Sequence, residues 1–279
     1  MMQISRRIIN RFFPFSYKVL LKKMKRTGTK IFWDFDDHII ISKEVTRSGF
    51  DFFSEISDKI IVTHDYLKYL VKEQFINKVY LLPTTDGDVN SNYDCNEQEN
   101  KKLLIDNEIR LIWVGTSGNL KYVLPMIPLL DEYAGQQHKK IILKIVCNEN
   151  IKYDVKHLVL ENFIWNRELA VQELLKSHIG LMPLTNSDFA NGKGGFKLIQ
   201  YLSGALPIIG SNIGFNKEVC DNTVGKLLDN IYDKIELFDA IDYIVNNWDL
   251  LSANALLRWY DKFNFNTNFD FWKKILGKN

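Results

Sequence analysis

The sequence has few cysteines and few prolines. Three cysteines occur among its 279 residues (Cys95, Cys147 and Cys220), and no two of them form a C-x-x-C pair. This odd, scattered set excludes a disulfide framework and a cysteine-based zinc site, and it suits a reducing compartment. Six prolines and fifteen glycines are too few for a collagen-like or low-complexity chain. With 46% hydrophobic and 25% charged residues, the composition is that of a folded protein.

Long hydrophobic runs are also missing. A membrane-spanning helix needs about 18 or more consecutive apolar residues, and no run approaches that length. The N-terminus lacks an apolar stretch ending in a small-residue cleavage site, which is the pattern of a secretory signal. We therefore expect a cytoplasmic protein without a spanning segment.

Acidic residues are absent from the first 30 positions, which carry nine Lys or Arg. The whole chain has a net charge of +2, so residues 31–279 carry −7. The small total gives no support to a nucleic-acid partner, and no further basic stripe follows. The charges alternate with apolar side chains, which predicts an amphipathic helix interrupted near Pro14.

This basic head, residues 1–30, has two interpretations. It contacts an anionic membrane surface, or it is an ordinary domain helix with a solvated basic face. In either case we expect Ile8, Ile9, Phe12 and Leu20 to turn toward the sheet that follows or toward the membrane, and the basic residues toward solvent or lipid.

Beyond residue 30, short apolar runs alternate with helical patterns, which is typical of a parallel α/β sheet. Three strands are predicted before a polar stretch at 84–107 and six after it. We interpret this stretch as a linker and the start of a polar helix. The predicted strands are 30–35, 59–63, 78–82, 109–114, 141–146, 159–164, 179–183, 207–211 and 224–228. The predicted helices are 65–74, 122–133, 171–177, 195–201 and 231–246, followed by a Trp-rich helical tail. Only the second part has the strand count of a complete doubly wound sheet.

The run Asn191-Gly192-Lys193-Gly194-Gly195-Phe196-Lys197 leads directly into an amphipathic helix. Backbone N–H groups and the helix dipole at such a start favour an anion, the glycines let a diphosphate approach, and the two lysines add positive charge. It is neither a Walker loop nor a G-x-G-x-x-G fingerprint after the first strand. The alternative is a flexible turn whose glycines only cap a helix.

A second glycine loop, Gly115-Thr116-Ser117-Gly118, follows the first strand of the second part. Ligands of doubly wound sheets bind at the carboxyl ends of the strands. We therefore expect the two glycine loops to face a common cleft.

A third feature is the acidic run Asp34-Phe35-Asp36-Asp37-His38 at the end of the first strand. Asp34 and Asp36 are two residues apart, so an extended chain would place them on one side as ligands for a hard cation. Asp36, Asp37 or His38 could instead serve as a general acid or base. The third interpretation is a polar loop that caps a strand.

Taken together, the segments 192–202, 206–209 and 211–216, with 179–184, 112–116 and 33–37 in the same order, resemble the GT-B glycosyltransferases of family 4. The resemblance covers the chain from Lys30 to its end. It implies an α/β fold of two Rossmann-like domains, and retaining transfer of a sugar from a nucleotide-sugar donor in the cleft between them. No cofactor and no essential metal are implied, since the nucleotide sugar is itself a substrate.

The resemblance also implies roles for individual residues. Gly115 and Thr116 would lie near the phosphates, and Trp165 would frame the nucleotide base. Lys193 and the amides of Gly194, Gly195 and Phe196 would hold the diphosphate and donor sugar. Gln200 would hydrogen-bond the ribose, and Asp36 and Asp37 occupy the loop where many members have a functional His. The candidate catalytic residues are thus Asp36, Asp37, Lys193 and Lys197, and the candidate donor-binding residues are Gly115, Thr116, Trp165, Gly192, Gly194, Gly195, Phe196 and Gln200.

The sequence departs from the family pattern at several of these positions. Gly192 and Gln200 stand where the family has the two Glu of its E-x7-E motif, and Thr116 replaces a frequent Arg, whose charge Lys193 and Lys197 could supply. The N-terminal domain is short. We expect a basic head at 1–30, an incomplete N-terminal domain at 31–105, a full doubly wound parallel sheet that binds the donor at 106–247, and C-terminal helices at 248–279 that pack back toward the N-terminal domain.

Three functions remain open from the sequence. The first is an active glycosyltransferase that extends a lipid-linked or polysaccharide acceptor at the cytosolic membrane face. The second is a non-catalytic or vestigial nucleotide-sugar-binding protein that needs a partner, which would explain the short first domain. The third is a GT-A enzyme with a metal at Asp34 and Asp36, which the G-K-G-G loop at 192–195 disfavours.

Overall fold

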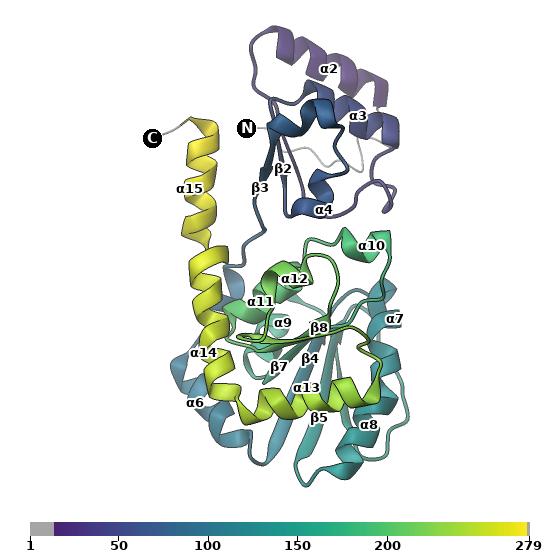
Figure 1. The fold of residues 1–279 in the computed structure, drawn as a ribbon, viewed down its shortest axis with the longest axis vertical. Helices are drawn as coiled ribbons and strands as arrows, with labels where there is room; N and C mark the ends of the chain where they lie inside the picture. Colours follow the sequence, from purple (N-terminus) through teal and green to yellow (C-terminus); the bar gives the residue numbers. More distant parts are fainter. Residues whose placement is uncertain (1–13, 278–279) are drawn as a thin grey trace. The chain divides into compact units, whose positions relative to one another are not determined.

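The computed structural model describes residues 14–277 and divides them into two compact units (Figure 1). The first unit contains the described residues up to Thr84 together with Ser187–Gly194. The second unit contains Thr85–Asn186 and the chain from Gly195 onward. The chain therefore passes between the units three times, and the last passage falls inside the glycine-rich loop.

The first unit has a parallel sheet of three strands in the order β1-β2-β3. Its strands are β1 (Phe32–Phe35), β2 (Lys59–Val62) and β3 (Val79–Leu81), close to the predicted ranges. Trp33 and Phe35 alternate with exposed or partly exposed residues along β1, so both rings face the core. They pack with Phe50 and Phe53, with ring centroids 4.7 to 5.4 Å apart. This aromatic cluster fills the small core.

The helices of the first unit are α2 (Pro14–Arg26), α3 (Arg47–Ile56), α4 (Asp65–Lys68), the 3₁₀ helix η1 (Glu73–Lys78) and α10 (Asp188–Asn191). The helix predicted at 65–74 is therefore too long. The chain turns after α4, where the N–H of Val71 donates to the carbonyl of Lys68, and this turn lets the Val71 side chain, 4% exposed, enter the core.

The described part of the basic head is helical, as predicted, over α2. Its buried face carries Leu21, and Tyr17 and Met24, one turn away on either side, are partly buried. Leu20 is 42% exposed, so of its two predicted orientations, toward the sheet or toward a membrane, it does not take the first. The reason is helical geometry, since Leu20 projects about 100° away from Leu21. Ile8, Ile9 and Phe12 lie outside the described residues.

The second unit has a six-stranded parallel sheet in the order β6-β5-β4-β7-β8-β9. The strands are β4 (Glu108–Val114), β5 (Lys140–Cys147), β6 (Val159–Ile164), β7 (Ile179–Met182), β8 (Ile208–Ser211) and β9 (Gly225–Leu228). All six predicted strands are present within a residue or so of their predicted bounds. The chain moves outward from β4 to β6, then returns to β7 on the other side of β4. The topological switch point, where such sheets bind ligands, therefore lies between β4 and β7.

The remaining elements belong to the second unit. They are α5 (Asp88–Ser91), α6 (Cys95–Leu104), η2 (Ser117–Asn119), α7 (Leu120–Val123), η3 (Leu124–Met126), α8 (Ile127–Gln136), α9 (Arg167–Leu175), α11 (Phe196–Ser203), α12 (Asn216–Val219), α13 (Lys234–Asn246), α14 (Trp248–Arg258), the π-helix η4 (Trp259–Phe263) and α15 (Phe265–Leu276). The helix predicted at 122–133 is divided into α7, η3 and α8. Pro125 and Pro128 lack the N–H that a continuous helix needs, which accounts for the 3₁₀ turn between them. None of the helices over residues 14–277 combines the length and the hydrophobicity that a bilayer crossing requires.

The division between the units differs from the predicted boundary at residue 105. The polar stretch from Thr85 belongs to the second unit, because its side chains bond there: Asp86 accepts from Ser203, and Gln98 donates to Ser252. Composition alone suggested a linker, since α6 exposes most of its surface. The C-terminal helices also belong to this unit, where α14 contacts α11 and the Trp248 indole donates to the carbonyl of His178.

Candidate functional site

A pocket of about 470 Å³ lies at the carboxyl ends of the strands in the second unit. Gly115 and Thr116 follow β4, Asn148 follows β5, and Trp165 follows β6, so one edge of the sheet supplies all four. The first turn of α11 completes the wall. The lining residues are Asp88, Val89, Val114, Gly115, Thr116, Asn148, Trp165, Arg167, Ala170, Val171, Leu174, Phe196, Lys197 and Gln200. The pocket therefore occupies the β4 side of the topological switch point.

Six of the twelve candidate residues line this pocket together: Gly115, Thr116, Trp165, Phe196, Lys197 and Gln200. They come from the loop after β4, the end of β6 and the first turns of α11. Of the predicted glycine loop at 191–197, only Phe196 and Lys197 line the pocket, and its glycines do not. Gly195 directly precedes the pocket-lining Phe196 in the same unit. The other five candidates, Asp36, Asp37, Gly192, Lys193 and Gly194, belong to the first unit.

The loop after β4 is held by its own hydrogen bonds. The N–H of Gly115 donates to the carbonyl of Val146 at 3.0 Å, and the N–H of Ser117 donates to Asn148 Oδ1 at 2.8 Å. Asn119 Nδ2 donates to Thr116 Oγ1 at 2.9 Å. These bonds fix the ends of β4 and β5 relative to each other, so that Thr116 and Asn148 form one rigid rim.

The helix α11 begins at the pocket. Gly195 caps it with φ of +63°, a left-handed conformation that favours glycine. Leu198, Ile199 and Leu202 are buried and anchor the helix to the sheet. Phe196 and Lys197 in its first turn line the pocket. The positive end of the helix dipole and the Lys197 ammonium therefore favour an anionic group here.

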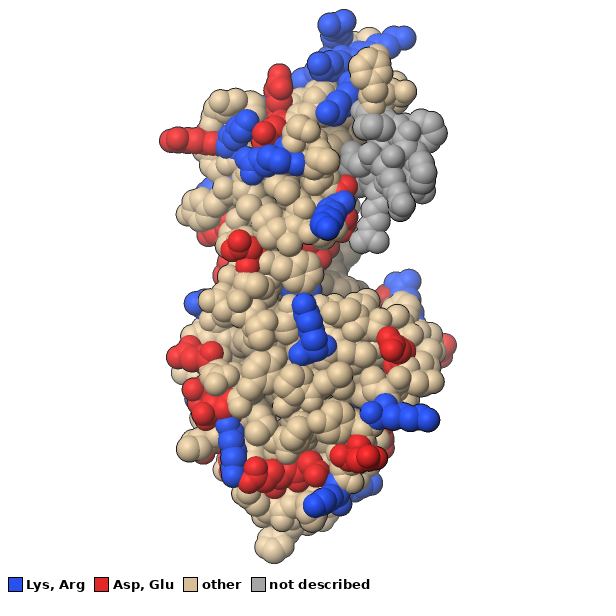
Figure 2. Space-filling view, turned by 90° about the vertical axis from the view of Figure 1, so that its right-hand side faces the viewer, with Lys and Arg blue, Asp and Glu red and all other residues tan. Residues whose placement is uncertain are grey.

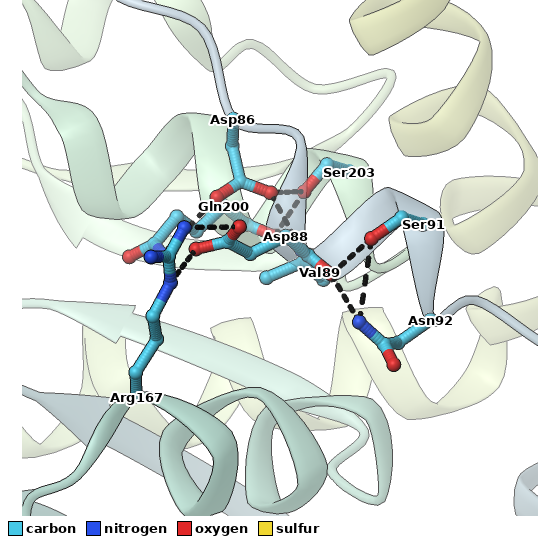
Figure 3. A network of polar contacts seen from close by, with 8 residues as sticks. All are labelled: Asp86, Asp88, Val89, Ser91, Asn92, Arg167, Gln200 and Ser203. Atoms are coloured by element: carbon cyan, nitrogen blue, oxygen red, sulfur yellow. Dashed lines mark hydrogen bonds and ion pairs between the residues drawn. The ribbon is translucent and has the colours of Figure 1, made fainter.

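An acidic and amide cluster lies at the α5 side of the pocket (Figure 3). The Asp86 carboxylate is 2% exposed and accepts from the N–H of Val89 at 2.9 Å, Ser203 Oγ at 3.0 Å and Gln200 Nε2 at 3.3 Å. This buried carboxylate is therefore held by three donors from two helices.

Beside it, Asp88 and Arg167 form a bidentate pair (Figure 3). The guanidinium donates from Nε and Nη2 to the two carboxylate oxygens at 2.5 and 2.6 Å. These hydrogen bonds hold the pKa of the Asp88 carboxyl below its usual range. The pair joins α5 to the first turn of α9 at the pocket wall.

The pocket thus has three chemically different parts. Lys197 and the start of α11 provide positive potential, Gln200 and Asp88 provide polar oxygens, and Val89, Val171 and Leu174 provide an apolar floor. The Trp165 ring is 50% exposed, and its backbone N–H is fixed to the carbonyl of Cys147 at 2.7 Å. An anionic ligand with a flat ring and hydroxyl groups matches this arrangement.

The candidates of the first unit form a second cluster. The N–H of Gly194 donates to Asp37 Oδ1 at 2.9 Å, which joins the 187–194 segment to the acidic run. This bond differs from the expectation that the Gly194 amide holds a diphosphate. A Cβ at Gly194 would lie 2.3 Å from the carbonyl oxygen of Asp36, so only glycine permits this approach.

The predicted glycine-rich loop is therefore divided between the two units. Gly192 and Lys193 belong to its first half, which is part of the first unit. The N–H of Gly192 donates to the carbonyl of Asp188 at 3.0 Å and closes α10, whose first turn Ser187 caps. Lys193 Nζ lies 4.5 Å from the centre of the Phe189 ring. Neither residue lines the pocket described above.

Two histidines of the first unit are buried beside these residues. Burial lowers the pKa of His64 to about 4, although Asp37, Asp65 and a hydrogen bond with the Lys193 backbone act in the opposite direction. Burial likewise lowers the pKa of His38. Both imidazoles are therefore neutral at pH 7. Among residues 14–277, no three His, Cys, Asp or Glu side chains are grouped to hold a metal ion.

Sequence reasoning missed four polar residues of the pocket region: Asp86, Asp88, Asn148 and Arg167. Asn148 directly follows Cys147, the last residue of β5, and its position beyond a predicted strand was the available signal. Asp86 and Asp88 lie in the stretch interpreted as a linker, so nothing in the pattern marked them. Only the tertiary fold brings them to Gln200 and Arg167.

Comparison with known proteins gives matches in structure alone, since neither a protein-family model nor a curated protein sequence matches the chain. HepE from Anabaena in complex with UDP has a TM-score of 0.68 at 10% identity, over 93% of this chain and 76% of that chain. Sucrose-phosphate synthase from Thermosynechococcus elongatus has a TM-score of 0.65 at 13% identity, over 99% of this chain and 81% of that chain.

The pneumococcal O-GlcNAc transferase GtfA in complex with UDP and GlcNAc has a TM-score of 0.59 at 14% identity. The match covers 92% of this chain but 59% of GtfA. These similar structures are GT-B glycosyltransferases, and in each the match leaves part of the other chain uncovered. The chain therefore has the GT-B fold of two α/β units, with a shortened N-terminal sheet.

Proposed function

We propose that this protein is a glycosyltransferase that takes a sugar from a nucleotide-sugar donor bound in the pocket of the second unit. The observation that carries the proposal is the pocket itself. It lies at the switch point of a doubly wound sheet and combines a helix start and Lys197 with an exposed indole and an amide oxygen acceptor. A nucleoside diphosphate has a matching anion, base and ribose.

The donor is proposed to be a UDP-sugar. HepE and GtfA were solved with UDP, and an α-glucosyltransferase of the same fold was solved with UDP-glucose. In this chain the diphosphate would lie at the start of α11 near Gly115 and Thr116, and the base would lie on Trp165. Gln200 would meet the ribose.

Transfer is proposed to proceed with retention, as the family resemblance implies, and without an essential metal. Lys197 and the α11 dipole supply positive charge where the leaving diphosphate develops negative charge. In the first unit, Asp36, Asp37 and Lys193 are the candidate catalytic residues. The Gly194 N–H donates to Asp37 Oδ1, and this bond joins the acidic run to the segment that carries Lys193.

The acceptor is proposed to be lipid-linked or a polysaccharide, reached at an anionic membrane surface. On α2 the exposed residues Phe15, Val19, Lys22, Lys23 and Arg26 follow one helical stripe. Figure 2 shows Lys and Arg side chains gathered over the end of the first unit that carries α2. In this stripe the apolar side chains would enter the surface of an anionic bilayer, and the basic side chains would contact its headgroups.

Titration calorimetry with UDP in the presence of EDTA tests the proposed donor site. We expect wild-type protein to bind UDP, and the Lys197→Ala variant to bind it about tenfold more weakly, because it loses a charged contact to phosphate. The control is Lys121→Ala, which removes an exposed lysine outside the pocket. Absence of UDP binding, or equal affinity in all three proteins, contradicts the proposal, and binding that requires manganese contradicts metal independence.

A further inference from the structure

Gln200 is an ambiguous pocket residue because its amide has two chemically opposite ends. Oε1 only accepts hydrogen bonds, whereas Nε2 only donates them. If Oε1 faces the ligand, the pocket selects ligand groups that donate hydrogen bonds. If Nε2 faces the ligand, it selects groups that accept them. Residues around the amide must therefore fix its orientation if the pocket is to be selective.

Asp86 is placed to fix that orientation. Its carboxylate offers acceptors only, and Oδ2 already receives the N–H of Val89 at 2.9 Å and lies 3.0 Å from Ser203 Oγ. The other oxygen, Oδ1, is 3.3 Å from Gln200 Nε2. With Oε1 in that place, two acceptors would face each other at a buried site, where an unsatisfied polar contact is costly.

The geometry points to Asp86 as a positioning residue, which holds Gln200 so that its carbonyl oxygen is the hydrogen-bond acceptor presented to a ligand hydroxyl. This inference rests on the proposed function, in which the hydroxyls belong to the ribose of a nucleoside diphosphate. Asp86 itself is 2% exposed and does not line the pocket, so it acts only through Gln200.

The pairing also explains why this chain has Gln and not Glu at position 200. A glutamate there would place a second carboxylate beside Asp86 at hydrogen-bonding distance, and like charges at that separation repel strongly when buried. With Asp86 present, the neutral amide provides the acceptor without a second negative charge. Asp86 and Gln200 together are a carboxylate–amide pair in which only the amide reaches the ligand.

The test compares the affinities of UDP and 2′,3′-dideoxy-UDP by calorimetry. In wild-type protein we expect the dideoxy compound to bind about tenfold more weakly, since the Gln200 acceptor loses its donor. In Asp86→Asn the amide at position 86 can pair with either end of the Gln200 amide. We therefore expect the affinity for UDP to fall to that of the dideoxy compound, whose own affinity stays unchanged. A merely structural role of Asp86 would weaken both ligands equally.

The double variant Asp86→Asn/Gln200→Glu exchanges the two chemistries and keeps one carboxylate in the pair. We expect it to restore the preference for UDP. The amide introduced at position 86 then donates to the carboxylate introduced at position 200, whose remaining oxygen accepts from the ribose. This variant also tests the proposal if Asp86→Asn alone fails to fold. Asp106→Asn, at a highly exposed carboxylate, is the control.

Three outcomes decide between the proposals. A preference for UDP that is lost in Asp86→Asn and restored in the double variant supports the inference. If Asp86→Asn keeps the preference for UDP, or if the double variant does not restore it, the inference about Asp86 is wrong. Binding of UDP by the wild-type protein would still support the proposed function. If wild-type protein binds neither compound, the proposed function fails and the inference fails with it.

Discussion

At the scale of single residues, two adjacent glycines have different roles at the junction of the units. Gly194 lies against the Asp36 backbone in the first unit, and Gly195 begins α11 in the second with φ of +63°. The sequence predicted that these glycines let a diphosphate approach the backbone. The close approach to Gly194 is made by the protein's own backbone, which a search for diphosphate loops does not anticipate.

His178 gives the second unit a pH-dependent stability. Its ring is fully buried, Nδ1 accepts from the N–H of Arg110 at 2.9 Å, and Nε2 lies 3.1 Å from the carbonyl of Lys101. A neutral ring with the proton on Nε2 satisfies both bonds. Burial lowers the pKa of His178 to about 3.

We predict that the free energy of unfolding falls as the pH is lowered below about 6.5, because the unfolded histidine then takes up a proton that the folded one refuses. The loss approaches about 1.4 kcal/mol per pH unit for this group and ends near the folded pKa of about 3. Urea unfolding measures this loss between pH 6.5 and 5, where the pH is above the pKa values of most carboxylates. His178→Gln should have a shallower slope, with His38 and His64 of the first unit, whose pKa values burial also lowers, contributing to the remainder. An unchanged slope would contradict this account.

At the scale of elements, continuous apolar runs made the strands of the second unit predictable. Strand β5 is buried along seven of its eight residues, and six of those seven are apolar. The exception is Lys144, which is buried as an ion pair with Glu173 at 2.7 Å. Helix bounds were less predictable where a proline interrupts the helical hydrogen-bond pattern, as Pro125 and Pro128 do. The polar helix α6 was predicted only as a helix start without bounds, because its one deeply buried residue is a lysine, Lys101.

The pocket was predictable to the extent that its residues follow strands or begin a helix. Gly115, Thr116 and Lys197 belong to such local patterns. Asp86 and Arg167 do not, because each acquires its role from a residue about 80 to 115 positions away in the chain. No local pattern contains such a contact.

The α2 stripe yields a prediction about membranes. We expect the protein to bind liposomes that contain anionic lipid and to be released by salt, since charge attraction is screened over about 8 Å at physiological ionic strength. Lys22→Glu/Lys23→Glu should bind at least several-fold more weakly. Lys152→Glu/Lys156→Glu makes the same change in charge at exposed positions of the second unit and should bind like wild type. Equal binding by all three proteins in sedimentation assays would show that α2 is only a solvated helix.

At the scale of the whole molecule, the two units have unequal sheets. The first has three strands around an aromatic core, and the second has six around the switch point and carries the pocket. Every residue that lines the pocket lies in the second unit. The proposed donor site therefore belongs to one unit, and the length of the other unit does not change its lining.

Photolabelling with 5-azido-UDP, followed by mass spectrometry of the peptides, tests this assignment most directly. We predict covalent label within the pocket-lining segments 114–116, 165–174 and 196–200, and its loss when excess UDP competes. Labelling in Lys197→Ala should be weaker at the same residues. Label that falls in the first unit, or that excess UDP does not displace, would contradict the claim that the second unit holds the nucleotide.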